Sequence, residues 1–545
     1  MKINLISIED ALNNTGFRKI SAYVRRLYPD TGLFYVTTAN SHSFAHLLLM
    51  RDTGALQDSD VEAIAQGVAR ADVVGFSSMT HYADLTAQII AAVRRINPNA
   101  YIVWGGIHPI IEPEDAIKHA DAICTGEGEF AFEAFLRAFE AGVPVENTPS
   151  FWINTPDGVK KNRNLPLMTA PQMDSLPLPT YQDGELIYKR GPGFIPVQPQ
   201  DFIDYSGLAY KTVWSIGCPL KCTYCGNSKF IDYDKSYRVV RHSSPATIIA
   251  EVKNAIARHP HISTVFFEDD SFMALPMKTI EEFCRLYRQE IDLPFVITGL
   301  IPNYVREDKM ELLVAAGMYR VRMGVQSGSE NILKFYERPT PLPRIQESCL
   351  ILNKYRGYMI PPALDIILDN PVETVDDNVA TLDLLYEMPR PYTLNIFSLR
   401  VIPNTALAAA IEARGVHIDD IRTTYTRPQP TLSNLAVFLL ATGQPPAWLY
   451  KWLRARAQPS HLPQKHYPTL MMVMRFIYLL KRASDHLRMM DFTVLSGPPA
   501  TWAWKLGITR FWHKHVFPRY VPGSLPPVTP GPEGGATSAS YTSGP

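Results

Sequence analysis

Short apolar runs alternate with helical patterns over the first 142 residues. Apolar residues recur every three to four positions over 83–96 and 130–139, which predicts amphipathic helices. Runs such as 73–76 and 101–104 are almost wholly apolar, as strands of a parallel sheet covered on both faces are. We therefore expect a doubly wound α/β domain over residues 1–142. Its expected strands are 3–7, 33–38, 73–78, 101–105 and 122–125.

A second alternating series predicts a partial (β/α)6 barrel over residues 206–410, in which the chemistry lies at the carboxyl ends of the strands. Ser244 followed by Pro245 is a typical helix start within this series. The expected strands are 212–216, 264–268, 295–298, 320–325, 364–368 and 394–399, and the expected helices include 245–257, 277–289, 306–315 and 374–386.

Three other regions lack this alternation. Residues 143–205, rich in Pro, Asn, Asp and Gly, are predicted to be a linker that packs on its neighbours. Residues 411–521 carry amphipathic helical patterns and predict a helical C-terminal domain. The tail 522–545 is rich in Pro, Gly, Ser and Thr, which predicts disorder.

The bulk composition narrows the class of protein. Hydrophobic residues make up 46% and charged residues 19%, as in ordinary folded proteins. Lys plus Arg and Asp plus Glu both number 53, so there is no basic excess of the kind that nucleic-acid binding requires. The chain shows no signal peptide and no spanning segment, from which we expect a cytoplasmic location.

Three of the six cysteines, Cys218, Cys222 and Cys225, fall within eight residues directly after an expected strand. Iron–sulfur clusters take thiolate ligands, and three sulfurs in one loop would leave one iron of a four-iron cluster open to another ligand. A structural zinc site usually has four protein ligands, and no second Cys or His pair of suitable spacing lies nearby. Zinc and a chance group of unbound thiols are the alternatives.

The pattern Cys-x3-Cys-x-aromatic-Cys, with Tyr224 as the aromatic residue, resembles the radical S-adenosylmethionine (SAM) superfamily. The resemblance implies that Cys218, Cys222 and Cys225 hold a 4Fe-4S cluster and that SAM binds the open iron, with Tyr224 nearby. It also implies reductive cleavage of SAM to a 5′-deoxyadenosyl radical, with an external electron donor of the flavodoxin or ferredoxin type.

The end of the second expected barrel strand is similar to the family's contact with the methionyl amine of SAM. Glu268 and Asp269 stand there, and a carboxylate suits a cationic ammonium group. The alternative is a solvated acidic turn.

Two later turns also resemble contacts with SAM. Gln326, Ser327 and Ser329 follow the fourth expected strand, where the family contacts the ribose and the carboxylate, often through Glu at the position of Gln326. A turn in which Ser329 caps the next helix is equally compatible. Residues 368–374 resemble the turn on the adenine side.

The first domain has glycine-bearing turns after three expected strands. Ahead of a radical SAM barrel, these turns resemble the cobalamin-binding domain of one branch of the superfamily. The resemblance implies that Ser77, Ser78, Gly105, Gly106 and Glu127 contact cobalamin.

The Asp-x-His-x-x-Gly loop that supplies a histidine to cobalt in other cobalamin proteins is missing here. Glu9 and Asp10 follow the first expected strand instead. His81, His108, water or nothing could therefore lie below cobalt.

The resemblance implies a cobalamin-dependent radical SAM enzyme, with methyl transfer to an unactivated carbon of a small biosynthetic intermediate as the leading hypothesis. A radical SAM cyclase or oxidoreductase that binds cobalamin without methyl transfer is the second. A non-catalytic iron–sulfur electron carrier or sensor is a third, from another class.

The C-terminal region carries no recognised motif. Its aromatic residues either cap an apolar substrate or form a packed core, and its basic helix end could touch a membrane surface. The aromatic residues are Trp448, Trp452, Phe476, Tyr478 and Trp502.

Overall fold

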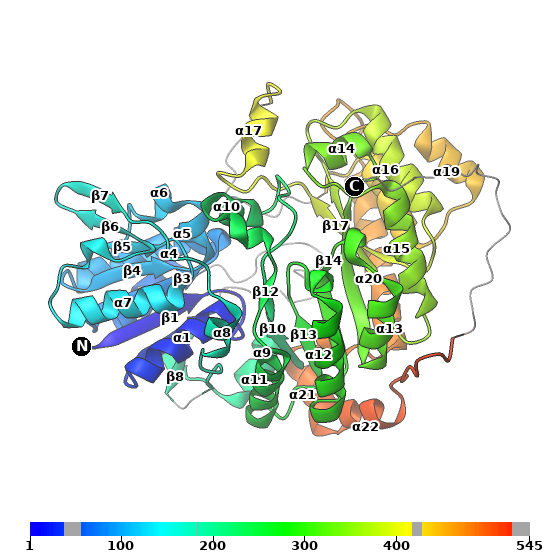
Figure 1. The fold of residues 1–545 in the computed structure, drawn as a ribbon. Helices are drawn as coiled ribbons and strands as arrows, with labels where there is room; N and C mark the ends of the chain where they lie inside the picture. The colour runs from blue at the N-terminus through cyan, green and yellow to red at the C-terminus, as the bar shows by residue number, and fades with distance from the viewer. Residues whose placement is uncertain (38–55, 182–183, 417–427, 526–545) are drawn as a thin grey trace, which may run out of the picture.

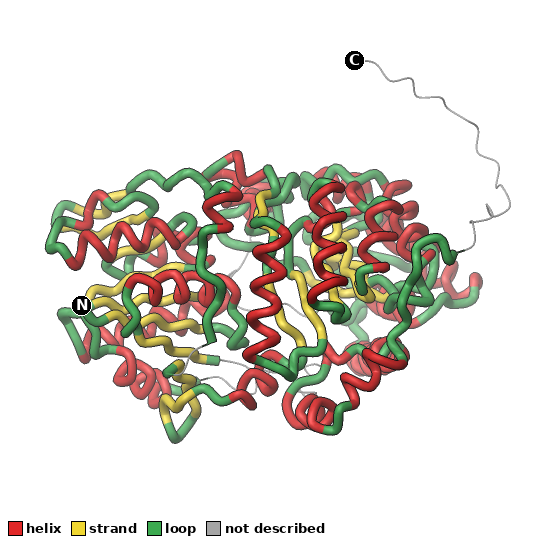
Figure 2. Tube along the Cα trace, turned by 60° about the horizontal axis from the view of Figure 1, so that its bottom comes forward, coloured by secondary structure: helices red, strands yellow, loops and turns green. Residues whose placement is uncertain are grey.

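The computed structural model describes residues 1–37, 56–181, 184–416 and 428–525. Two bodies, each built on a parallel sheet, lie side by side, and the C-terminal helices belong to the second body (Figure 1). Figure 2 shows the strands of both bodies between layers of helix. No helix in the described ranges is long and apolar enough to cross a membrane. Most of the expected disordered tail, 526–545, lies outside the described residues.

The first body contains the predicted doubly wound sheet. Its five central strands are parallel, in the order β5-β4-β3-β1-β2. These strands are β1 (Ile3–Ile8), β2 (Gly32–Val36), β3 (Val73–Ser78), β4 (Tyr101–Gly105) and β5 (Ala122–Cys124). The helices of this part are α1 (Thr15–Leu27), α3 (Asp58–Val68), α4 (Ala83–Ile96), α5 (Ile107–Ile111), α6 (Pro113–Ala116) and α7 (Gly128–Glu140).

Residues 143–205 differ from the predicted linker, because they extend this sheet at both edges to nine strands. One hairpin pairs antiparallel with β5, and the other begins with a strand parallel to β2. The strands have four or five residues each, too few for a periodic pattern, and it is the pairing with a preformed sheet edge that stabilises them. They are β6 (Phe151–Thr155), β7 (Gly158–Lys161), β8 (Glu185–Lys189) and β9 (Gly193–Pro196), with helices α8 (Ala170–Asp174) and α9 (Pro199–Ser206).

The second body confirms the predicted partial barrel of six parallel strands. Their order is β10-β13-β14-β15-β16-β17. The strands are β10 (Ala209–Thr212), β13 (Thr264–Phe267), β14 (Phe295–Leu300), β15 (Met318–Gln326), β16 (Ala363–Leu368) and β17 (Thr393–Ser398). The helices are α10 (Asn227–Tyr233), α11 (Pro245–Arg258), α12 (Met277–Glu290), α13 (Glu307–Ala315), α14 (Glu330–Phe335), α15 (Leu342–Lys354), α16 (Val375–Glu387) and α17 (Ala406–Glu412). Ser244 caps α11 as predicted, accepting a hydrogen bond from the backbone N–H of Thr247.

The expected first barrel strand, 212–216, is divided in the structure. Barrel strand β10 ends at Thr212, and β11 (Ser215–Ile216) pairs antiparallel with β12 (Arg241–His242) in a sheet of its own. The carboxylate of Asp269 accepts hydrogen bonds from the backbone N–H groups of Trp214, at 3.0 Å, and Ser215, at 2.7 Å. These bonds hold the chain where it leaves the barrel.

The C-terminal region is helical, and its longest helix covers the edge strand of the barrel. The Tyr478 hydroxyl donates to the backbone oxygen of Leu394 on β17, at 2.5 Å. A covered edge cannot pair with another chain. The helices are α18 (Leu432–Thr442), α19 (Ala447–Arg454), α20 (Pro468–Arg488), α21 (Gly497–Lys505) and α22 (Ile508–His515).

Candidate active site

The three predicted cysteine ligands lie in one loop between β11 and α10. Gly217 introduces this loop with φ +117, and a Cβ there would lie 2.6 Å from the backbone oxygen of Val239. Only glycine accommodates both the torsion angle and the close approach. Cys218 and Cys222 are buried in a small apolar group, against which Cys225 packs. The loop thus gathers the three cysteines in one small apolar group.

The surroundings of Cys218 and Cys225 favour the neutral form of these two thiols. Burial raises the pKa of Cys218 to about 11 and that of Cys225 to about 12. A metal centre must therefore displace protons when it binds, and the binding energy of the metal offsets this cost. In the described residues, the unpaired thiols fit a cluster of soft metal ions better than a disulfide.

Arg338 is a residue of this site that the sequence pattern did not indicate. Its Nη1 lies 3.7 Å from the sulfur of Cys222 and 3.3 Å from the hydroxyl oxygen of Tyr224, and its Nη2 donates to the backbone oxygen of Gly324 at 2.6 Å. The side chain is only 6% exposed. A buried guanidinium beside a ligand sulfur opposes the negative charge of a thiolate-bound cluster. Arg338 follows a helix after β15 and carries no motif, so only the fold brings it here.

Tyr224 and Gln326 lie next to Arg338. The ring of Tyr224 packs edge-to-face on Tyr336, with centroids 4.9 Å apart. Gln326 has φ +75, and a Cβ on Gly324 would lie 2.6 Å from its amide nitrogen. Gly324 therefore leaves room for two polar side chains that converge beside the cysteine loop. The structure thus brings both predicted residues beside Arg338 and the cysteine loop.

Ser327 and Ser329 are buried, and their hydroxyl groups are engaged within the protein. The Ser327 hydroxyl lies 3.1 Å from that of Thr381, and the Ser329 hydroxyl donates to Asp377. Ser329 also caps α14 by accepting from the backbone N–H of Ile332 at 3.3 Å. The helix-capping alternative is thus realised, and these contacts position the turn that carries Gln326.

The three acidic residues of the turn after β13 have different surroundings. Glu268 is 42% exposed, forms an ion pair with Lys211 at 3.6 Å, and faces the first body. Asp269 is buried and bonds to the backbone before the cysteine loop, and burial raises its pKa to about 6. The charge of Asp270 raises the pKa of Cys218 and of Cys225, and its carboxylate bonds to the side chain of Asn227, just after the loop. Of the three acids, Asp270 is the one directed toward the cysteine loop, and it was not among the predicted ligands.

A cavity of about 530 Å³ lies at the carboxyl edge of the first sheet. The glycine turns after β3, β4 and β5 line it, and its apolar wall includes Leu5, Val103 and Phe132. Lys211, Val213 and Glu268 of the barrel close its other side. A cavity with glycine edges and apolar walls between two domains fits a large ligand with a flat ring and a nucleotide tail.

The predicted cobalamin contacts divide between this cavity and the structure around it. Ser77, Gly105 and Gly106 line the cavity. Ser78 is fully buried and accepts a hydrogen bond from the indole N–H of Trp104 at 3.0 Å. Glu127 accepts hydrogen bonds from Arg241, at 2.8 Å, and from the backbone N–H of Met168, at 2.6 Å. Ser78 therefore packs inside the first body, and Glu127 contacts the second body, so that neither residue lines the cavity.

Neither candidate histidine lies on the cavity lining. His108 is fully buried on α5 against Trp104, with ring centroids 4.9 Å apart, and His81 is exposed. Four carboxyl groups, including those of Glu9 and Glu129, line the cavity instead. Burial raises the pKa of Glu9 to about 7 and raises that of Glu129. A carboxyl group that is partly protonated near neutral pH can both donate and accept hydrogen bonds, which suits the amide groups at the edge of a corrin ring.

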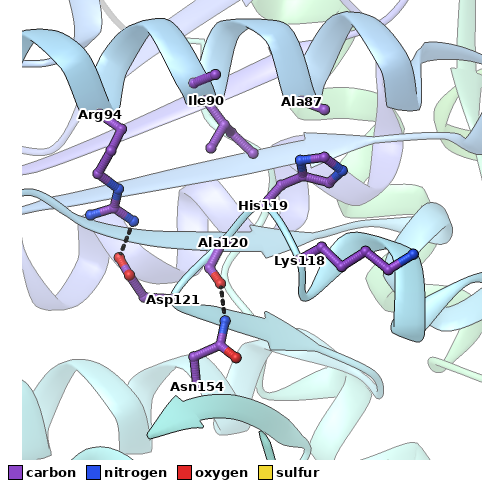
Figure 3. A pocket seen from close by; sticks show the side chains of 9 residues that line it. Ala87, Ile90, Arg94, Lys118, His119, Ala120, Asp121 and Asn154 are labelled. Atoms are coloured by element: carbon purple, nitrogen blue, oxygen red, sulfur yellow. Dashed lines mark hydrogen bonds and ion pairs between the residues drawn. The ribbon is translucent and has the colours of Figure 1, made fainter. Parts of the chain in front are cut away.

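A second hollow, of about 360 Å³, lies on the surface of the first body between α4 and the chain before β5 (Figure 3). Arg94 and Asp121 form an ion pair across it at 2.7 Å, and the amide of Asn154 donates to the backbone oxygen of Ala120 at 2.8 Å. These polar groups bond within the hollow, and we give it no functional assignment.

Comparison with known proteins agrees with this arrangement. Residues 212–385 match the family model "Radical SAM superfamily", and residues 18–136 match "B12 binding domain". A protein of Pyrococcus horikoshii, "Uncharacterized methyltransferase PH0819", is 23% identical over 326 residues, which span 59% of this chain and 65% of that protein. The "Anaerobic magnesium-protoporphyrin IX monomethyl ester cyclase" of Synechocystis sp. is 24% identical over 417 residues, or 75% of this chain and 76% of the cyclase.

Solved structures share the fold. OxsB, a cobalamin-dependent SAM radical enzyme with aqua-cobalamin and SAM bound, has a TM-score of 0.61 at 13% identity and covers 93% of this chain and 84% of its own. The radical SAM methyltransferase TsrM from Kitasatospora setae, with tryptophan and a SAM analogue bound, has a TM-score of 0.58 at 15% identity and covers 75% and 76%. With both family models on one chain, the cofactors are a 4Fe-4S cluster, SAM and cobalamin. The chain belongs to the family of cobalamin-binding radical SAM enzymes.

Proposed function

We propose that this enzyme transfers a methyl group to an unactivated carbon atom of a small biosynthetic intermediate. The observation that carries the proposal is the shared cavity, in which the glycine turns of the first body face Lys211, Val213 and Glu268 of the barrel. A cobalamin held in this cavity would lie against the barrel that carries the cysteine loop, so that both cofactors could act on one substrate. Relatives named as methyltransferases, such as PH0819 and the "Bacteriochlorophyllide d C-8(2)-methyltransferase" of Chlorobaculum tepidum, support it.

When bound, the cluster, SAM and cobalamin supply the electron transfer, the radical and the methyl group. The chain's own residues hold and orient them. Cys218, Cys222 and Cys225 would bind the cluster, and Arg338 counters its negative charge beside Cys222. We propose that Tyr224 and Gln326 contact SAM, and that Ser77, Gly105 and Gly106 contact cobalamin.

Three predicted residues take indirect roles in this proposal. Asp269 orients the backbone before the cysteine loop. Ser327 and Ser329 hold the turn that presents Gln326. Apolar walls around the cavity exclude water from the reacting groups.

The test is turnover by the reconstituted enzyme under strong reductant, with SAM labelled in its methyl group and pools of candidate metabolites. We expect a product heavier by one methylene unit, together with 5′-deoxyadenosine and S-adenosylhomocysteine. Replacement of all three loop cysteines by alanine should abolish iron binding and product formation. Full iron content and SAM consumption in that variant would refute the site.

Cyclisation or oxidation is the second candidate, because the cyclase of Synechocystis sp. aligns over more of this chain than PH0819 does. A product of unchanged carbon count would favour it. An electron carrier or sensor would need neither the shared cavity nor Arg338, and would form neither 5′-deoxyadenosine nor S-adenosylhomocysteine.

We also propose a cytoplasmic location and an external donor of the flavodoxin or ferredoxin type. Reduced thiols are required at the cluster loop, and a reducing compartment maintains them.

A further inference from the structure

The longest C-terminal helix, α20, exposes an apolar face to solvent. Between Thr469 and Leu487, each exposed position on this helix carries an uncharged side chain. We call six of these residues, each between 43% and 54% exposed, the α20 apolar face. They are Leu470, Met472, Val473, Phe476, Ile477 and Leu480.

This face is additional to the one that packs on the barrel. Met471 and Tyr478 are buried on the opposite side, where α20 lies against α18 and bonds to β17. An ordinary surface helix directs its apolar stripe to the core and polar residues to water. At a rise of about 1.5 Å per residue, the exposed apolar side chains from Leu470 to Leu487 extend over roughly 25 Å. A contiguous exposed apolar strip of this size marks an interaction site.

Exposed tryptophans accompany this face. Trp448 and Trp452 on α19 are 71% and 45% exposed, and α19 packs against the same helix α18 as α20 does. The guanidinium of Arg456 lies over the ring of Trp452, at 4.5 Å from its centroid. Of the five aromatic residues expected to cap a substrate or form a core, only Tyr478 packs in the core, whereas Trp448, Trp452, Phe476 and Trp502 are exposed. None of the five lines the cavity. Trp with flanking cations is typical of proteins that lie at the interface of a bilayer.

The net charge of the C-terminal helical region indicates what kind of partner covers the α20 apolar face. Residues 428–525 contain twelve Lys and Arg but only two acids, Asp485 and Asp491, although the whole chain is neutral. Asp491 is buried, and Asp485 is paired with Lys481. A second copy of this chain would bring the same positive charge to the contact, whereas anionic lipid offers both negative headgroups and hydrocarbon. The positive charge of this region and its exposed apolar face therefore both fit an anionic lipid surface.

We propose that the C-terminal helices dock the enzyme on the surface of an anionic lipid bilayer through the α20 apolar face. In Figure 1, α20 lies in the second body, far from the nine-stranded sheet of the first. The docking is independent of the reaction assigned above, so a failure of either proposal leaves the other standing.

Flotation of the purified full-length protein with lipid vesicles tests the proposal. We expect the protein to float with vesicles that contain phosphatidylglycerol and much less with vesicles of phosphatidylcholine alone. Added salt should weaken the binding, since it screens the attraction between exposed charges. A paired substitution, Ile477→Glu with Leu480→Glu, should lower the bound fraction about tenfold or more, because it removes buried apolar area and adds negative charge.

Leu350→Glu is the matched control, because Leu350 is 55% exposed on barrel helix α15. It should float as the unchanged protein does. The substituted side chains are exposed, so the variants should keep the melting temperature of the unchanged protein. If the glutamate pair lowers the melting temperature, the milder pair Ile477→Ser with Leu480→Ser replaces it in the flotation test.

Three results would overturn the proposal. The unchanged protein could stay in solution with phosphatidylglycerol vesicles, or the paired variant could float as well as the unchanged protein. The third is a dimer in sedimentation velocity that the paired substitution dissociates while no flotation occurs, which would assign the face to a second copy.

Discussion

At the scale of single residues, the site depends on side chains that hold other groups in place. Arg338 joins the cysteine loop to β15 through Cys222 and Gly324. Asp269 ties the backbone before that loop to the end of β13. Both are buried, and the hydrogen bonds that they form link segments far apart in the chain.

Arg338→Met should lower the reduction potential of the cluster, because a positive charge beside Cys222 favours the reduced, more negative state. It also removes the donor to the backbone oxygen of Gly324, which should cost about 1–3 kcal/mol of stability. A spectroelectrochemical titration and a melting curve measure the two effects. Arg338→Lys keeps the positive charge, so the reduction potential of its cluster should lie closer to that of the unchanged protein than the potential of Arg338→Met does. Equal potentials in all three proteins would contradict the role given to Arg338.

Gly106→Ala should weaken cobalamin binding. Gly106 has φ +90, and a Cβ there would lie 2.7 Å from the backbone oxygen of Ser78, at the cavity edge. Gly142→Ala is the control, since Gly142 has φ +66 and nothing within 4 Å. Both should lose about 1 kcal/mol or more from the unfavourable torsion angle. Only Gly106→Ala should change the absorbance titration with cobalamin, and equal titrations of the two variants would argue against the assignment.

At the scale of elements, buried polar contacts join the C-terminal helices to the barrel. Asp491, after α20, accepts hydrogen bonds from the hydroxyl of Tyr319 on β15, at 2.6 Å, and lies 3.1 Å from Nη1 of Arg320. His486 of α20 lies 2.7 Å from the same carboxylate. Burial alone would raise the pKa of Asp491, but the bond to His486 and the charge of Arg320 outweigh it and hold the pKa well below its usual range.

The Asp491 carboxylate should therefore make the docking of these helices sensitive to acid. Its folded pKa is below the unfolded value of 3.8, so its stabilising contribution is complete above that value and is lost as the pH falls below it. Asp491→Asn should cost about 3 kcal/mol near neutral pH, because the partners remain buried. Melting temperatures measured from neutral pH to about pH 3 should fall less steeply in the variant. Parallel curves would contradict this reading.

At the scale of the whole molecule, the two bodies share one cavity. β11 and β12 lie between them, and Arg241 of β12 pairs with Glu127 of the first body. The cysteine loop leaves this small sheet, so its position depends on the contact between the bodies. The cavity is likewise complete only where barrel residues meet the glycine turns.

Val213→Trp should weaken cobalamin binding without any change in the first body, because Val213 lines the cavity from the barrel side. Iron content should stay as in the unchanged protein, since the cysteine loop is intact. Val159→Trp, at a 40% exposed position on β7, is the control. If both variants bound cobalamin equally, the cavity would not be shared in the way the structure indicates.

Much of the architecture was predictable because its determinants are local. Periodicity of apolar residues predicted both sheets and most of their helices, since a strand or helix must direct its apolar side to a core. Candidate cluster ligands could be named from the sequence because eight consecutive residues contain all three cysteines. The edge strands β6 to β9 were missed because pairing with the sheet stabilises them, and their short sequences carry little pattern.

The amino-acid sequence by itself determined the two α/β units, the cysteine loop and the glycine turns, because each is a pattern among neighbours in the chain. Only the tertiary structure decided which polar residues meet. Arg338 reaches Cys222 across 116 positions, and Glu127 reaches Arg241 across 114. It also decided that α20 turns an apolar face outward, because periodicity shows that a helix has an apolar side but not whether the fold covers it.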